Sequence, residues 1–197
     1  MKPKLVSLTG PSCGGKTSLL GDLCKTDLFC KVVSFTSREP REGEVEGIDY
    51  HFKTATECQD LIVSGRVQEY SMYGGHYYGR EKQAIARAMD SGKIPVLILD
   101  VDGLKLIRQQ YASEAFSVYV SVPLEELMDR FLRRFKEQCL YHEDITDIKY
   151  YVKRLQSLLF EHANWETAYK YNKVINNFTY SYRRDIIQSL ISEIIGK

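Results

Sequence analysis

The chain has 197 residues, of which 44% are hydrophobic, and this is enough for one large domain with a full core. Its 27 lysines and arginines nearly balance 26 aspartates and glutamates, which argues against a nucleic-acid-binding protein. No apolar run reaches the roughly 20 residues of a membrane helix, and the first strand begins too close to Met1 for a signal peptide. Five scattered cysteines without a CxxC pair argue against disulfides and a zinc site, and favour the cytoplasm.

Short apolar runs typical of buried strands alternate along the chain with helical patterns. The expected strands are 4–8, 32–35, 96–101, 116–122 and 174–175, and the expected helices are 17–24, 80–90, 124–137, 148–170 and 182–195. Strands rich in Val, Ile and Leu that are separated by helices predict a parallel α/β sheet covered on both faces. Two stretches, 36–78 and 130–154, break this alternation and are expected to project from the sheet as lobes.

A phosphate-binding pattern, GxxxxGK(S/T), lies between the first expected strand and the first expected helix. It reads Gly10-Pro11-Ser12-Cys13-Gly14-Gly15-Lys16-Thr17 and is followed by Ser18. Glycines allow the backbone to curl so that its N–H groups point at an anion, and the helix adds its positive end. Lys16 supplies a charge for the β- and γ-phosphates of ATP, and Thr17 a hydroxyl for Mg²⁺. The alternative, a glycine-rich turn that only precedes a helix, is disfavoured by the flanking strand and helix.

A second group of residues lies in segment 34–52, where two arginines surround a proline and a Gly-Glu turn leads to Asp-Tyr. A solvated charged loop is the alternative interpretation. Together with Glu69-Tyr70 and Gly75-His76-Tyr77-Tyr78-Gly79, however, the segment closely resembles guanylate kinases, which are P-loop nucleoside monophosphate kinases. The resemblance runs nearly end to end, from the phosphate loop to Val174-Ile175-Asn176-Asn177.

The resemblance implies a role for each matching position. The acceptor phosphate would be held by Arg38, Arg41, Tyr50 and Tyr78, which suits the paired, charge-assisted bonds of arginine and the neutral hydroxyls of tyrosine. Guanine would be read by Glu69, which can accept from N1–H and N2–H₂, and by Ser34 near O6. Asn177 would lie near the adenine of ATP. Lid arginines would close on the transferring phosphoryl group, and they match Arg130, Arg134 and Arg154.

Two of these features also have simpler interpretations. Asp100 and Asp102 follow the apolar run 96–99, where carboxylates can orient Mg²⁺ through water or hold substrate groups. An aspartate in this position can also merely cap the next helix. Arg130 and Arg134 lie four residues apart on one helical face, which alone is typical of a solvated basic surface. The phosphate loop favours the lid interpretation.

Three departures from the family are visible. Arg80 replaces the usual Thr or Ser after Tyr-Tyr-Gly, and an arginine can donate two bonds to guanine O6 and N7. Gly103-Leu104-Lys105 stands where the family has Gln-Gly. The spacing from Arg134 to Arg154 is several residues longer than usual, and the insert 135–146 has no assigned role.

The resemblance implies the three-layer α/β/α fold of P-loop NTPases, with a five-stranded parallel sheet. We expect a core of residues 1–33, 81–125 and 156–197, a monophosphate-binding lobe over 34–80 and a helical lid over 126–155. The expected reaction is Mg²⁺-dependent transfer of the ATP γ-phosphoryl group to GMP or dGMP, catalysed by Lys16, Arg38 and the lid arginines. We expect only nucleotides as partners, no nucleic acid or membrane, and a monomer or homodimer in the cytoplasm.

Other functions remain open at this point. Arg80 and the altered region after Asp102 allow a kinase for a modified or noncanonical purine deoxynucleoside monophosphate. A catalytically inactive guanylate-kinase-like module that binds proteins is disfavoured by the intact Lys16 and Thr17. Ribose-bisphosphate kinases on a similar scaffold are disfavoured by Ser34 and Glu69.

Overall fold

The main sheet of the protein has five parallel strands. The computed structural model describes residues 3–141, 148–176 and 183–196. The strand order is β2-β7-β1-β8-β9, and the strands are β1 (Leu5–Thr9), β2 (Phe29–Lys31), β7 (Ile94–Ile98), β8 (Ala115–Ser121) and β9 (Lys173–Asn176). This confirms the predicted parallel α/β fold. Every residue of the central strand β1 is buried, as expected for a strand covered on both faces.

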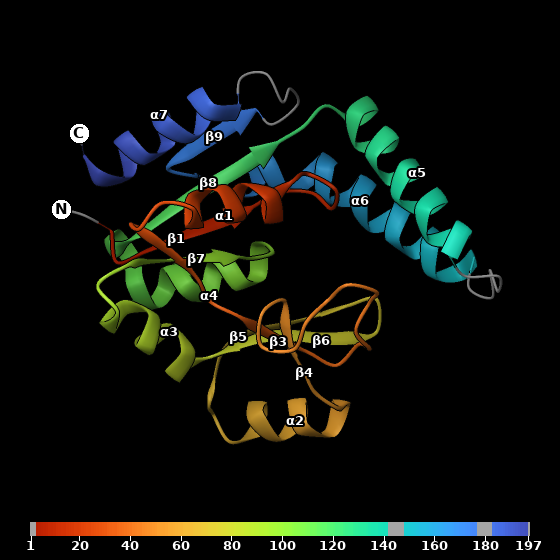
Figure 1. Cartoon of the computed structure of the whole chain (residues 1–197), viewed down its shortest axis with the longest axis horizontal. Helices are drawn as coiled ribbons and strands as arrows, with labels where there is room; N and C mark the ends of the chain where they lie inside the picture. Colours follow the sequence, from red (N-terminus) through yellow and green to blue (C-terminus); the bar gives the residue numbers. More distant parts are fainter. Residues whose placement is uncertain (1–2, 142–147, 177–182, 197) are drawn as a thin grey trace.

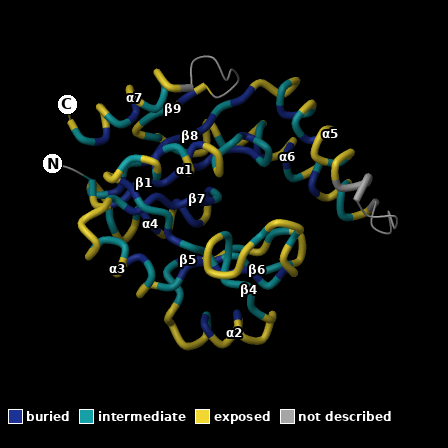
Figure 2. The backbone as a smooth tube through the Cα atoms, in the orientation of Figure 1, coloured by how far each residue is buried: buried dark blue, intermediate teal, exposed yellow. Residues whose placement is uncertain are grey.

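Helices cover both faces of this sheet, so the core has three layers (Figure 1). On one face, α1 (Lys16–Cys24) and α7 (Arg183–Ile195) pack against Val6 and Val96. On the other, α3 (Lys82–Asp90) and α4 (Val101–Tyr111), which is followed by the short 3-10 helix η1 (Ala112–Glu114), pack against Leu5 and Leu97. Successive strand side chains point to opposite faces, which is why neighbouring residues join different clusters. In Figure 2 the buried residues follow β1, β7 and β8 through the middle of this core.

Three sequence predictions are wrong in their boundaries. The expected strand 32–35 is replaced by β2 in the main sheet and β3 (Ser34–Thr36) in a second sheet, because the chain leaves the main sheet between them. The expected strand 96–101 ends at Ile98, because α4 begins at Val101. The expected helix 80–90 begins at Lys82, because Arg80 pairs with β5 as part of a strand.

The second sheet forms a small α+β lobe below the core in Figure 1. Its order is β4-β3-β6-β5, with β4 (Tyr50–Phe52), β5 (Val67–Tyr73) and β6 (His76–Glu81), and α2 (Ala55–Val63) covers one side. Phe35, Cys58 and Leu61 form its own buried cluster. Gly79 is required here, because a Cβ atom would lie 2.5 Å from the Phe35 ring. Apart from Glu81 at the end of β6, these strands fall within the stretch 34–80 in which the sequence predicts a monophosphate-binding lobe.

Two long helices extend from the other end of the core, α5 (Leu124–Tyr141) and α6 (Ile148–Ala168) (Figure 1). Their bases pack together through Leu127, Phe131 and Leu158, and Cys13 of the phosphate loop packs against the same cluster. The helix α5 continues beyond the predicted end at 137. The insert 135–146 lies partly outside the described residues.

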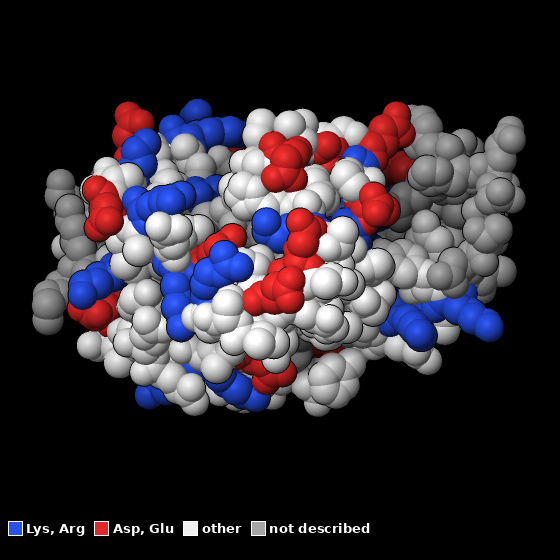
Figure 3. Space-filling model, turned by 90° about the horizontal axis from the view of Figure 1, so that it is seen from below, with Lys and Arg blue, Asp and Glu red and all other residues white. Residues whose placement is uncertain are grey.

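The surface carries charges of both signs. Figure 3 shows Lys and Arg side chains interspersed with Asp and Glu on the face seen from below. Among the described residues, no helix is both long enough and apolar enough to span a membrane.

Candidate active site

A cavity of about 770 Å³ is bounded by the phosphate loop, the lobe and the two long helices. This volume is within the usual range for small-molecule sites. Most of the predicted site residues line it: Ser12, Cys13, Gly14, Gly15, Lys16, Thr17, Ser18, Ser34, Arg38, Arg41, Tyr50, Glu69, Tyr78, Arg80, Asp100, Arg130, Arg134 and Arg154. The fold therefore brings together residues that are up to 142 positions apart in the chain.

The phosphate loop lies between β1 and α1 and is curled around the Lys16 side chain. The Lys16 ammonium donates to the carbonyl oxygens of Gly10 at 2.7 Å and Pro11 at 2.8 Å. Gly15 has φ of 85°, a left-handed conformation that favours glycine. Burial lowers the pKa of Lys16, although the carboxylates of Glu161 and Asp100 oppose this. The loop thus holds a dehydrated ammonium beside its backbone N–H groups.

Glu161 of α6 faces this loop and was not predicted from the sequence. Its carboxylate accepts from the Ser12 amide N–H at 2.6 Å, and only 5% of the residue is exposed. Burial raises the pKa of Glu161, against the opposing charge of Lys16. Glu161 follows Arg154 by seven residues, so both lie on one face of α6. This spacing is the sequence signal that could have identified Glu161 as a site residue. Helix α6 thereby presents both an arginine and a carboxylate to the phosphate loop.

The three predicted lid arginines all reach the same cavity. Arg130 donates to the Cys13 carbonyl at 3.4 Å, and Arg154 to the Ser12 hydroxyl at 3.5 Å. Burial lowers the pKa of Arg134, and the positive charges of Arg154 and Arg41 lower it further. Such a concentration of positive charge in a partly dehydrated space is suited to a polyanion.

The four residues predicted to hold the acceptor phosphate, here called the phosphate clamp, lie on the lobe: Arg38, Arg41, Tyr50 and Tyr78. Glu44 holds Arg38 of this clamp in place. Arg38 forms two bonds of 2.6 Å to the Glu44 carboxylate, and its guanidinium lies 5.0 Å from the centre of the Tyr50 ring. Burial disfavours this cation, but the Glu44 bond outweighs it and raises the pKa of Arg38. The rings of Tyr50 and Tyr78 meet edge to face at 6.0 Å. Glu44 was not singled out from the sequence, where it reads as one of several charges in a loop.

The part of the cavity predicted to read the base, around Ser34 and Glu69, contains a buried ion pair between Glu69 and Arg80. Glu69 accepts from Arg80 at 2.5 Å, and a second Arg80 nitrogen donates to the Ile98 carbonyl at 2.8 Å. Burial raises the pKa of Glu69, which the charge of Arg80 opposes. The sequence allowed Arg80 to donate to two atoms of a guanine, but here its two terminal nitrogens instead bond to Glu69 and the end of β7.

The two predicted strand-end aspartates have different surroundings. Asp100 lines the cavity and also caps α4, because its carboxylate accepts from the Gly103 amide at 2.7 Å. Asp102 is not among the residues that line the cavity, and it pairs on the surface with Lys105 at 2.8 Å. A Cβ atom at Gly103 would come within 3.3 Å of Glu69, so this glycine allows the helix to approach the base pocket closely.

Two further predicted ATP-binding residues, Gly10 and Pro11, are not among those that line the cavity. Gly10 and Pro11 contribute their carbonyl oxygens to Lys16. Asn177 lies outside the described residues.

Comparison with known proteins shows which family the chain belongs to. A family model described as guanylate kinase matches residues 2–177. The chain belongs to the guanylate kinase family. A guanylate kinase from Chlamydia felis is 32% identical over 191 residues, which cover 95% of this chain and 87% of that protein. One from Clostridium tetani is 28% identical over 193 residues, covering 98% of this chain and 84% of that protein.

A solved structure shares the fold of this guanylate kinase family member. The crystal structure of guanylate kinase from Anaplasma phagocytophilum covers 98% of this chain and 86% of its own, with a TM-score of 0.71 and 23% identity. As a member of this family, the chain is a nucleoside monophosphate kinase, which is a phosphotransferase. It supports this interpretation over the protein-binding module and the kinase for a modified purine.

Proposed function

We propose that this guanylate kinase family member transfers the γ-phosphoryl group of ATP to GMP or dGMP, giving ADP and GDP or dGDP. One observation carries the proposal: the phosphate loop around Lys16 lines the cavity from the core, and the clamp formed by Arg38, Arg41, Tyr50 and Tyr78 lines the same cavity from the lobe. A donor phosphate and an acceptor phosphate bound at these two places would face each other. Phosphoryl transfer requires mainly such positioning and charge neutralisation.

The chain's own residues would share this work. Lys16 and the loop amides would hold the β- and γ-phosphates of ATP, and the clamp would aim the acceptor phosphate. Arg130, Arg134 and Arg154 would neutralise charge in the transition state, in a site from which the closed lobes exclude water. Asn177 near the adenine remains a prediction from the family resemblance.

The family implies Mg²⁺, and the residues present fit it. Thr17 and Asp100 offer a hydroxyl and a carboxylate on the cavity wall, and oxygen atoms are the ligands that Mg²⁺ prefers. Within the described part of the chain, no group of three or more His, Cys, Asp or Glu residues forms a cage for a metal. This suits an ion that is held largely by substrate phosphates and water, where it would neutralise phosphate charge.

The base selected is guanine in this proposal, because Glu69 and Ser34, the two residues that the family resemblance assigns to base reading, both line the cavity. An ionised carboxylate has two oxygens with several lone pairs, so one that already bonds to Arg80 still accepts from a base. Guanine offers donors at N1 and N2, whereas adenine presents an acceptor at N1. The cytoplasm, where ATP is abundant and thiols stay reduced, is the proposed location.

A nucleotide panel tests this function directly. The wild-type chain is incubated with ATP, Mg²⁺ and one of GMP, dGMP, IMP, XMP or AMP, and release of ADP is followed. We expect turnover with GMP or dGMP at a kcat/KM at least tenfold above that with AMP. Turnover of none of the five, or a preference for AMP, would contradict the proposal.

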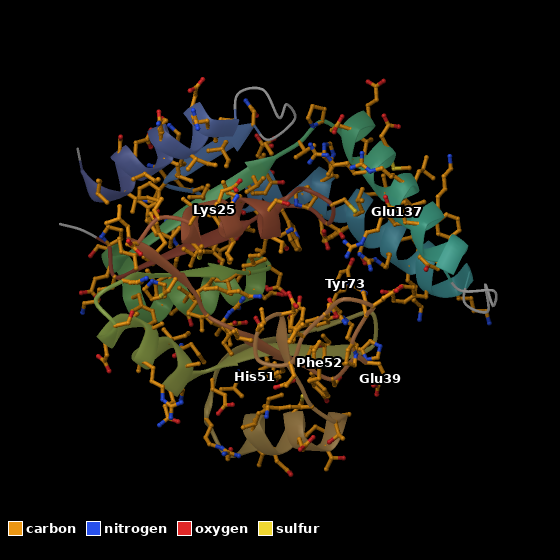
Figure 4. All side chains as sticks on the ribbon, in the orientation of Figure 1. Lys25, Glu39, His51, Phe52, Tyr73 and Glu137 are labelled. Carbon is orange, nitrogen blue, oxygen red and sulfur yellow. The ribbon has the colours of Figure 1, made fainter. Side chains whose placement is uncertain are left out.

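Replacing Lys16→Met provides a matched check on the phosphate loop, because it keeps the length of the side chain and removes its charge. We expect kcat to fall by about 10²–10³, the range seen when one transition-state donor is lost. Lys25→Met is the control, since Lys25 follows the same helix but pairs with Asp22 at the surface (Figure 4). A Lys16→Met protein with normal kcat would remove Lys16 from the mechanism.

A further inference from the structure

Buried polar atoms without a hydrogen-bond partner are concentrated at the cavity. Five such side-chain atoms occur among the described residues, and three belong to residues that line it: Arg38 Nε, Arg80 Nε and the Tyr73 hydroxyl. Buried polar groups in folded proteins are nearly always paired, so unpaired groups around a cavity indicate a bound partner. Arg38 and Arg80 are already part of the proposed site. Tyr73 is not used by any step described above.

Tyr73 is the last residue of β5, at the edge of the lobe that faces the phosphate loop. Its ring meets that of Tyr78, a member of the phosphate clamp, edge to face at 6.4 Å. Figure 4 shows its side chain in the space between the lobe and α6, not on the outer side of the lobe. The next residue, Gly74, has φ of 62° and would place a Cβ atom 3.6 Å from the Tyr150 ring of α6. This tight turn keeps Tyr73 close to the lid helix.

The hydroxyl of Tyr73 lies among charged and polar groups of the phosphate loop and of α6. Glu161 and Arg154 of α6 both act on it electrostatically, and the Ser12 and Ser157 hydroxyls lie at the limit of hydrogen bonding with it, without satisfying it by strict distance and angle criteria. Burial raises the pKa of Tyr73, and the carboxylate of Glu161 raises it further. The phenol therefore keeps its proton at neutral pH and is available as a donor.

We propose that the Tyr73 hydroxyl donates a hydrogen bond to the phosphoryl group as it passes from ATP to the acceptor nucleotide. The inference rests on the proposed kinase function and adds to it a neutral donor between the phosphate loop and the clamp. Tyr73 belongs to the lobe, whereas Ser12 belongs to the core and Arg154 to the lid helix. Its bond to phosphate is therefore made when the three parts are together, and it contributes to kcat more than to binding of either substrate.

A Tyr73→Phe variant tests the inference, because it removes the hydroxyl and keeps the ring against Tyr78. We expect kcat to fall about tenfold, as for one hydrogen bond to a charged group, with KM for ATP and GMP within twofold of wild type. The matched control is Tyr77→Phe on the neighbouring strand, whose hydroxyl accepts from Gln59 at 3.0 Å and does not line the cavity. This control should keep the wild-type kcat.

Two further measurements separate a phosphate contact from a packing role. Thermal unfolding should show a Tm for Tyr73→Phe that is unchanged or higher, because an unsatisfied buried hydroxyl has been removed. Trp165, the only tryptophan of the chain, lines the cavity, so its fluorescence reports the dissociation constants of ATP and GMP. These constants should stay within twofold of wild type.

The inference is overturned if Tyr73→Phe keeps kcat within twofold of wild type. It is also overturned if kcat falls together with Tm, or with an equal loss of nucleotide affinity, because the residue would then act through packing. A wild-type chain that phosphorylates no monophosphate would overturn the kinase function and this inference together. Active wild type with a fully active Tyr73→Phe would overturn the inference alone.

Discussion

Glu69 and Arg80 face each other inside the lobe, with 5% and 7% of their side chains exposed. Two ions in such a place have each lost most of their hydration, and their mutual attraction offsets that cost only while both are present. Removing either partner alone would therefore leave the other as a buried group without its counter-charge. A guanine that bonds to Glu69 would meet a carboxylate whose position Arg80 has already fixed, which reduces the entropy lost on binding.

Replacing Glu69→Gln should chiefly damage the use of GMP. The amide keeps the shape of the side chain but turns one acceptor into a donor, which would face the N1–H or N2–H₂ of guanine. We expect kcat/KM for GMP to fall about 10²-fold or more, with a much smaller change for AMP. Steady-state kinetics with both monophosphates check this, and Glu46→Gln, an exposed position in the same lobe that pairs with His51, is the control. Equal effects on the two substrates would contradict the assignment of Glu69.

Glu44 should make part of the stability depend on pH. Burial disfavours its ionised form, but the bond from Arg38 and the Arg41 amide outweigh this and lower the pKa of Glu44. A carboxyl group with a lowered folded-state pKa stabilises the fold above its unfolded value, near 4.3, and that stabilisation is lost as pH falls through the folded value. Glu44→Gln should therefore cost stability at pH 7 and much less near pH 3.

Urea unfolding at both pH values measures this difference for Glu44→Gln. Glu42→Gln, an exposed position two residues earlier, is the control and should behave like wild type at each pH. A loss for Glu44→Gln that is as large at pH 3 as at pH 7 would show that the ion pair with Arg38 is not its source.

At the level of single elements, α2 illustrates how local sequence sets a boundary. The Thr54 hydroxyl accepts from the Glu57 amide at 3.2 Å, and the Glu57 carboxylate accepts from the Thr54 amide at 2.7 Å. This reciprocal capping box satisfies two N–H groups that have no partner within the helix. It fixes the start of α2, which covers the lobe and packs Cys58 and Leu61 against Phe35.

Thr54→Ala should destabilise the protein by about 1 kcal/mol, the usual effect of losing an N-cap. Thr56→Ala, two residues later on the exposed side of the same helix, is the matched control and should be neutral or slightly stabilising, because alanine has the higher helix propensity. Chemical unfolding followed by circular dichroism measures both. Equal stability of the two variants would mean that the cap does not limit the stability of the lobe.

At the level of the whole molecule, the Tyr150 side chain connects the lobe to α6. The Tyr150 hydroxyl of α6 accepts from Arg41 of the lobe at 3.2 Å and from Arg154 of its own helix at 3.0 Å. Burial disfavours the phenolate, but the two arginines outweigh this and lower the pKa of Tyr150. The hydroxyl thus joins Arg41 of the lobe to Arg154 of α6.

Tyr150→Phe should loosen this connection, because Arg41 and Arg154 would repel each other without a shared acceptor. We expect faster hydrogen–deuterium exchange in residues 73–75 and 148–154 of the nucleotide-free protein, with the core strands unchanged. Tyr169→Phe, beyond the far end of α6, is the control. Exchange rates that are the same in wild type and Tyr150→Phe would mean that other contacts hold the lobe and lid together.

The sequence by itself determined the phosphate-loop pattern and the parallel sheet, whereas the roles of the clamp and lid arginines are predictions from the family resemblance. The phosphate loop and the sheet are encoded locally, by glycine and lysine spacing between a strand and a helix and by apolar runs of fixed period. Strand and helix boundaries near residues 32, 80 and 99 were wrong for a different reason. There the chain passes between the two sheets, and pairing with distant strands outweighs local propensity.

Only the tertiary structure decided which charged groups hold one another. Ser12 and Glu161 are 149 positions apart, and Arg41 and Tyr150 are 109 apart, so no local pattern predicts either contact. The pairing of Arg80 with Glu69 and the unpartnered hydroxyl of Tyr73 likewise depend on how β5 and β6 fold against the core. Where packing buries a polar group, the tertiary structure alone decides whether a partner lies within reach, because dehydrated groups pair with whatever packing places beside them.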